Sequence, residues 1–117
     1  MKIKLCGVEL ELGIDMTDAD KVEKLEEKVE ILTDNLSKIE LQKKKFSQII
    51  REEVECTSSW LNEMFGEGTG KKVLKENISL QEVYGIVWTM NNLHRLHMNQ
   101  IVSDALAKYS PDRALRK

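Results

Sequence analysis

Apolar residues between positions 22 and 50 recur at alternating steps of three and four, with charged residues between them. In heptad notation, one set of seam positions holds Val22, Val29, Leu36 and Ile50, and the other holds Leu25, Leu32, Ile39 and Phe46. Lys43 takes one further seam position. A heptad predicts a helix with a narrow apolar stripe that needs a partner helix. That partner is a second helix of this chain or another copy, and the sequence leaves both open.

The helical pattern extends past this seam in both directions. Thr17 is placed to cap its beginning, and helical spacing continues to Phe65. We therefore expect a helix over 17–65, either continuous or bent. A bend is allowed near the three lysines at 43–45 or near 56–59, and the second place is the weaker because Thr-Ser-Ser is a poor helix former.

Two runs of alternating apolar and polar residues precede the helix. The first covers residues 2–5 and the second covers 8–14, with Cys6-Gly7 between them. Glycine tolerates the positive φ of a two-residue hairpin turn. This predicts a β-hairpin over 2–14. A lone hairpin is marginal, so we expect it to pack on the helices or on the strands of another copy.

Three glycines in the segment 66–70 end the long helix. Gly66 follows its last turn, and Gly66 and Gly68 are expected to shape the turn that comes next. A short helix is expected over 71–76. The sequence GEGTGKK superficially resembles a phosphate-binding loop, but it follows a helix and no Ser or Thr succeeds the lysine, so we interpret it as a turn.

The last helical segment begins after a capping box, in which Ser79 is followed three positions later by Glu82. Apolar residues then keep one helical face to about Tyr109, and Pro111 closes the segment. A helix over 80–109 is therefore expected.

These elements predict a single domain over residues 1–117, because 117 residues suffice for one small core and not for two. The fold class expected is α+β, mainly α: an N-terminal hairpin, a long helix and a C-terminal helix in a helical bundle. Ile31 and Leu41 lie off the heptad seam, which indicates that the stripe is widened by packing inside such a bundle.

Charge and hydropathy exclude several classes of function. The formal net charge is −2, whereas nucleic-acid binders carry a basic excess, so no nucleic-acid partner is expected. We interpret the lysines at 43–45 and the basic residues Arg113, Arg116 and Lys117 as solvated. No apolar run approaches a membrane span of about 20 residues, and the first residues lack the apolar region of a signal peptide. We expect a soluble protein of a reducing compartment, with no membrane contact.

Few residues are candidates for chemistry, and we expect no catalytic group, cofactor or metal. His94 and His97 share a helical face but lack the further ligands that zinc requires. Cys6 and Cys56 have neither metal-ligand spacing nor a nearby base. Trp60 and Trp88 are expected in the core, with one of them a candidate exposed anchor for a partner.

The run Trp60-Leu61-Asn62-Glu63-Met64-Phe65-Gly66-Glu67-Gly68-Thr69 resembles the tail assembly chaperones of long-tailed phages that infect Gram-positive bacteria. In that family an apolar helix end runs into Phe-Gly-Glu-Gly and a short helix, and a short strand pair precedes them. The resemblance implies a non-enzymatic protein of the host cytoplasm that binds the helical tape-measure protein and tail-tube subunits. The alternative is a self-associating coiled-coil adaptor, structural or regulatory, that captures another protein.

Both readings place the partner contacts on apolar helix faces, and we expect a homo-oligomer joined through the heptad. The residues expected to bind a partner or form the oligomer seam are Val22, Leu25, Val29, Leu32, Leu36, Ile39, Trp60, Leu61, Met64 and Phe65.

Overall fold

The computed structural model describes residues 1–75 and 79–109. Its elements are β1 (Lys2–Leu5), β2 (Val8–Glu11), α1 (Ala19–Glu40), α2 (Phe46–Phe65), α3 (Thr69–Leu74), α4 (Leu80–Asn91) and α5 (Leu93–Tyr109). The predicted class, mainly helical α+β with an N-terminal hairpin, is confirmed. The short helix expected over 71–76 is α3, which begins two residues earlier, at Thr69, and ends at Leu74. Residue 76 and the basic residues after Pro111 lie outside the described residues.

The N-terminal hairpin forms where the alternating pattern predicts it. The antiparallel strands pair Lys2 with Glu11 and Leu5 with Val8, and the connecting Cys6 and Gly7 have φ of +51° and +79°. Positive φ at both turn residues matches the right-handed twist of the strands. The inward-facing side chains Ile3, Leu5, Leu10 and Leu12 are buried. The hairpin thus packs on this chain's own core.

The cap of α1 differs from the prediction by one residue. Asp18, and not Thr17, is the N-cap, and its carboxylate accepts from the backbone N–H groups of Asp20 and Lys21. Thr17 instead donates its backbone N–H and its hydroxyl to Asp15 Oδ1, at 2.9 and 2.6 Å. A carboxylate is favoured over a hydroxyl at the positive end of the helix dipole.

The long helix expected over 17–65 is two helices, with a turn at residues 41–45. The seam position occupied by Lys43 offers nothing apolar to bury, so the apolar stripe is interrupted there. Lys44 Nζ lies 2.6 Å from Glu52 Oε1 of α2, which ties the turn to the next helix. The chain therefore reverses here, and the heptad does not continue to Phe46 and Ile50 as one seam.

The other expected weak place, residues 56–59, is continuous helix. Thr57 is fully buried, and its hydroxyl donates to the backbone carbonyl of Glu53 at 2.9 Å. The hydroxyl is satisfied one turn back along the helix, so it does not compete with the ladder of backbone hydrogen bonds. The prediction that this was the weaker of the two places is wrong for this reason.

The helix expected over 80–109 is interrupted at Asn92, which has φ −119° and ψ +18°. The amides of Asn91 and Asn92 donate to the carbonyls of Val87 and Trp88, at 3.0 and 2.8 Å. These side-chain bonds occupy the last carbonyls of α4 and end it. At the other end of α4, Ser79 is the N-cap, and it accepts from Gln81 rather than from Glu82.

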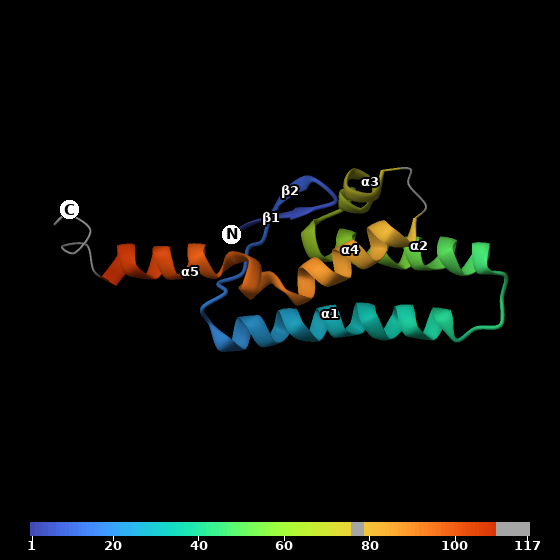
Figure 1. Ribbon diagram of the computed structural model, residues 1–117, viewed down its shortest axis with the longest axis horizontal. Coiled ribbons are helices and arrows are strands. Elements are labelled where there is room, and N and C mark those ends of the chain that lie inside the picture. Colours follow the sequence, from blue (N-terminus) through green and yellow to red (C-terminus); the bar gives the residue numbers. More distant parts are fainter. Residues whose placement is uncertain (76–78, 110–117) are drawn as a thin grey trace.

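The helices form a small bundle with the hairpin and α3 on one side (Figure 1). α1 packs on α2 and α4, α2 packs on α3, and α4 also contacts β1. One core of buried apolar side chains joins all these elements. The described chain is elongated, 63 × 26 × 22 Å, because α5 extends past the beginning of α1 and away from the other helices (Figure 1).

Candidate functional site

The heptad seam lies inside the chain. Leu25, Val29, Leu32 and Leu36 are buried, and Val22 and Ile39 near the ends of α1 are half-buried. α2 and α4 pack on α1 and complete the core with these residues. The apolar surface that favoured an oligomer through this face is therefore covered by the chain's own helices, and the prediction of an oligomer through it loses its basis.

Ile31 and Leu41 do not widen the stripe as predicted. Both side chains are exposed, by 56% and 83%, and Phe46 at the beginning of α2 is 66% exposed. The bundle thus buries only the seam residues of α1, and these three apolar side chains remain exposed to water.

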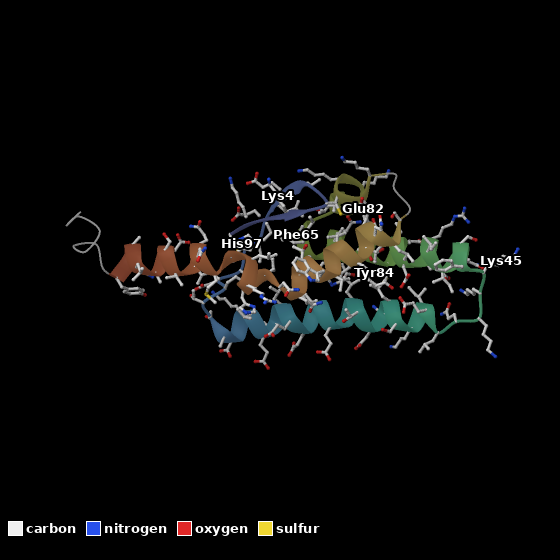
Figure 2. All side chains as sticks on the ribbon, in the orientation of Figure 1. Lys4, Lys45, Phe65, Glu82, Tyr84 and His97 are labelled. Atoms are coloured by element: carbon white, nitrogen blue, oxygen red, sulfur yellow. The ribbon has the colours of Figure 1, made fainter. Side chains whose placement is uncertain are left out.

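The aromatic end of α2 anchors that helix within the bundle. Trp60 and Leu61 are buried, and Met64 and Phe65 are half-buried against the core. The indole N–H of Trp60 donates to the carbonyl of Lys28 on α1 at 2.9 Å. Phe65 points into the space between the hairpin and the helices (Figure 2). In the single chain, these four residues pack in or against the core and stabilise the fold. They do not form a free surface.

The glycine segment after α2 is a tight turn. Gly66 and Gly68 have φ of +110° and +91°, and the N–H of Gly66 donates to the carbonyl of Asn62. The side chain of Asn62 accepts from Gly70 N–H at 2.8 Å, which holds the beginning of α3 against α2. A Cβ at Gly70 would lie 2.6 Å from the carbonyl oxygen of Ser58. Gly70 therefore permits the close approach of the two helices.

A polar cluster connects α1, α2 and α4 and runs from a buried carboxyl to the surface. Glu53 of α2 is fully buried, and its Oε1 lies 3.4 Å from the hydroxyl of Tyr84. The same hydroxyl donates to Glu40 at the end of α1. Glu53 Oε2 has no hydrogen-bond partner among the described residues. Tyr84 lies on α4 where this helix crosses α1 (Figure 2).

Protonation of Glu53 follows from this environment. Burial raises the pKa of Glu53 to about 7, the neighbouring carboxyl of Glu40 adds to the rise, and the Tyr84 hydroxyl opposes it. The hydrogen bond to Glu40 and burial raise the pKa of Tyr84 well above its ordinary value. A carboxyl with a pKa near 7 has the proton affinity of a general acid or base. None of the three grooves described for this chain is lined by Glu40, Glu53 or Tyr84, however. We therefore interpret the cluster as a structural set of polar contacts that joins three helices.

The largest of the three grooves, of about 660 Å³, lies beside α5. We call it the α5 groove. Its apolar lining is Met1, Ile14, Ile101, Ala105 and Tyr109, and its polar lining is Lys2, Asp15, Thr17, Gln100, Asp104 and Lys108. One wall is thus α5, and the other is the N-terminal residue pair with the segment that joins β2 to α1. Charges of both signs surround an apolar floor.

Asp15 and Lys108 lie on opposite walls of the α5 groove. The carboxylate of Asp15 accepts from Thr17, which lowers the pKa of Asp15, and the cation of Lys108 on α5 adds to that effect. On α5, the amide of Gln100 donates to Asp104 Oδ1 at 2.8 Å. The geometry suits a ligand with an apolar face and polar edges, such as an amphipathic helix.

The remaining candidates from the sequence lie apart from one another. Trp88 is 58% exposed on α4, so the expectation that both tryptophans are in the core is wrong for Trp88. His94 lines a second groove of about 370 Å³ between α1 and the α4–α5 junction, and His97 is half-buried near the beginning of α5 (Figure 2).

The two cysteines are free and half-buried. The thiol of Cys6 contacts the carbonyl of Glu82 at 3.8 Å, and burial raises its pKa to about 12. Burial also raises the pKa of Cys56, with the carboxyl of Glu53 contributing. A thiol held protonated in this way is a poor nucleophile.

Two negative findings apply to residues 1–75 and 79–109. Within these ranges, no three His, Cys, Asp or Glu side chains are grouped so that they could hold a metal ion. Over the same ranges, no helix combines the length and the apolar character needed to cross a membrane.

Sequence reasoning missed both the Glu53 cluster and the α5 groove. A signal for the first was present, since Glu53 occupies a position on the apolar face of α2, between Ile50 and Thr57. A charged residue in such a position indicates a buried polar contact. The groove depends on the direction α5 takes after Asn92, which the helical periodicity does not encode.

Comparison with known proteins identifies the family. A family model described as "Family of unknown function (DUF6673)" matches residues 7–117, so the chain belongs to that family. No curated protein and no solved structure gives a significant match.

Proposed function

We propose that this member of the DUF6673 family is a non-enzymatic tail assembly chaperone of a long-tailed phage. It acts in the host cytoplasm, where it binds the helical tape-measure protein and tail-tube subunits before the tail polymerises. The resemblance of the Trp60–Thr69 segment to such chaperones first suggests this role.

The observation that carries the proposal is the α5 groove. Its apolar floor and its mixed charges, Lys2 and Lys108 against Asp15 and Asp104, suit one face of an amphipathic helix. A partner helix lying beside α5 would bury the half-buried Ile101 and the exposed Tyr109. The helix-binding surface is then the α5 groove, whereas the heptad seam lies in the core.

The physical need for such a protein follows from the partner. A long helical protein with repeated apolar stripes aggregates when it is left uncovered. Many small copies, each offering one groove, cover such stripes. Weak individual contacts then add up along the partner through multivalency.

A second candidate function is a self-associating adaptor, structural or regulatory, that captures another protein. The exposed apolar side chains of α5 outside the groove, Met98, Val102 and Leu106, favour it. Such an adaptor would form oligomers without any effect on a tape-measure protein.

Co-expression tests the proposal. On this proposal, a very long gene downstream of this one would encode the tape-measure protein, and a gene upstream would encode the tail-tube protein. We expect the tape-measure protein to be soluble only with this chain and to co-elute with it in gel filtration. Equal insolubility with and without the chain, and no co-eluting complex, would overturn the chaperone proposal and leave the adaptor.

A further inference from the structure

One face of α5 carries a row of side chains that no other element among residues 1–75 and 79–109 covers. Only Leu93 of this helix is buried. Beyond it, the residues Arg95, Met98, Val102, Leu106 and Tyr109 follow one another at steps of three, four, four and three. Steps of this size keep side chains on one face of a helix. We call these five residues the α5 row. Met98, Val102 and Leu106 are 46–51% exposed.

The spacing of the α5 row is the same in both directions from Val102. A second α5 laid against it in the opposite direction therefore brings Val102 against Val102 of the other copy. The same arrangement brings Met98 against Leu106 and Arg95 against Tyr109, each contact occurring twice. A self-complementary surface of this kind is what a two-fold interface between identical chains requires.

Charge selects the antiparallel direction. Arg95 is the one charged residue of the row, and a parallel pair would place the two Arg95 side chains together. An antiparallel pair separates their positions by the length of the row, roughly 21 Å at about 1.5 Å per residue. It also places each guanidinium at the aromatic ring of Tyr109 of the other copy, a favourable contact.

We propose that the α5 row joins two copies of this chain in an antiparallel dimer centred on Val102. Gln100 and Asp104 of α5 lie outside the row; they are bonded to each other and line the α5 groove. The α5 groove shares Tyr109 with the row, but its other α5 residues lie outside the row, so the groove stays accessible beside the dimer contact. The dimer therefore carries two grooves related by a two-fold axis. The inference does not depend on the chaperone proposal.

Light scattering over a concentration series tests the dimer. The wild-type chain should reach twice its 13.5 kDa at high micromolar concentration. Val102→Asp should weaken dimerisation by about 100-fold or more, because a charge is placed at the centre of an apolar contact. Leu106→Lys should have the same effect. Both side chains are exposed in one chain, so circular dichroism should show unchanged helix content.

The matched control is Ile31→Asp, which places the same charge on an equally exposed apolar position of α1. It should dimerise like the wild type. A wild-type chain that stays at 13.5 kDa at high micromolar concentration would overturn the proposal. So would Val102→Asp and Leu106→Lys chains that dimerise as tightly as the wild type.

Disulfide trapping tests the direction of the helices. Met98→Cys chains are mixed with Leu106→Cys chains and oxidised, and the linked peptides are identified by mass spectrometry. The antiparallel dimer gives the mixed disulfide between positions 98 and 106. Disulfides that join only position 98 to 98 and 106 to 106 would contradict it.

Discussion

Trp60 of α2 donates its indole N–H to the main-chain carbonyl oxygen of Lys28 on α1, at 2.9 Å. This bond links the aromatic end of α2 to the middle of the heptad helix. Because Trp60 is also buried, it combines apolar packing with a directed contact between two helices. The pair explains why an aromatic helix end that resembles a binding motif serves the interior of this chain.

Trp60→Phe keeps most of the apolar volume and removes the donor. We expect it to lower the free energy of unfolding by about 1–3 kcal/mol, from the lost hydrogen bond and the remaining void. Trp88→Phe is the matched control, because Trp88 is exposed, and it should change stability by less than about 0.5 kcal/mol. Urea unfolding compares them, and equal losses for both variants would contradict the assignment of Trp60 to the core.

Leu32 and Ile31 are neighbours in sequence, but Leu32 belongs to the buried seam and Ile31 to the exposed surface of α1. Leu32 is fully buried and Ile31 is exposed. Leu32→Ala should cost about 2–5 kcal/mol, and Ile31→Ala less than about 0.5 kcal/mol. The loss for Leu32→Ala should be independent of protein concentration, since the seam is closed within one chain. A loss that shrinks as the chain concentration rises would instead place Leu32 between copies.

The heptad predicted the inward face of α1 because its apolar period is read from neighbouring residues alone. The position of the turn at 41–45 was one of two that the sequence allowed. Choosing between them required knowing that the Thr57 hydroxyl would bond to the Glu53 carbonyl, which depends on that hydroxyl being buried. The sequence also did not decide which helix covers the seam. The packing of α2 and α4 on α1 is tertiary structure, which the local periodicity of α1 does not encode.

The C-terminal half shows the same limit. The apolar periodicity predicted a helix that continues through Asn92. In the structure, two side-chain amides there donate to backbone carbonyls, and α4 ends. α5 leaves the bundle after this point, and both the α5 groove and the α5 row depend on that departure. The sequence shows which residues share a face of α5, but it does not show that this face is exposed.

Protonation of Glu53 should make stability depend on pH. The pKa of Glu53 is raised by burial to about 7 in the folded chain, against roughly 4.3 in an unfolded one. The folded chain therefore holds more protons in this window, and this group's stabilising effect is complete below about pH 4.3 and is lost as pH rises through 7. Glu53→Gln mimics the protonated form. It should exceed the wild type at about pH 8 by roughly 1–3 kcal/mol, and match it at about pH 4.

Urea unfolding at several pH values provides this measurement. The control is Glu55→Gln, an exposed position on the same helix, which should keep the pH dependence of the wild type. If Glu53→Gln retains that dependence as well, Glu53 is not the group responsible.

Two glycine substitutions should have opposite signs. Gly66 has φ +110° and ψ +156°, a region that other residues rarely occupy, so Gly66→Ala should cost about 1–3 kcal/mol. Gly85 lies in the interior of α4 with open space where a Cβ would be, so Gly85→Ala should gain about 0.5–1 kcal/mol. Thermal unfolding of the two variants checks both signs, and a stabilised Gly66→Ala would contradict the turn geometry.

The groove variant Ala105→Arg places a long charged side chain in the floor of the α5 groove, on an exposed position of α5. Ala107→Arg is its matched control, since Ala107 is also exposed on α5 but does not line the groove. Light scattering should give both variants the mass of the wild type, so that any difference between them reports on the groove alone.

The measurement that tests the proposed function most directly is the soluble fraction of the tape-measure protein co-expressed with each of these chains. The wild-type chain and Ala107→Arg should keep the tape-measure protein in the supernatant, and Ala105→Arg should leave it in the pellet. A tape-measure protein that is equally soluble with the wild type, with Ala105→Arg and with no chain at all would contradict the proposal.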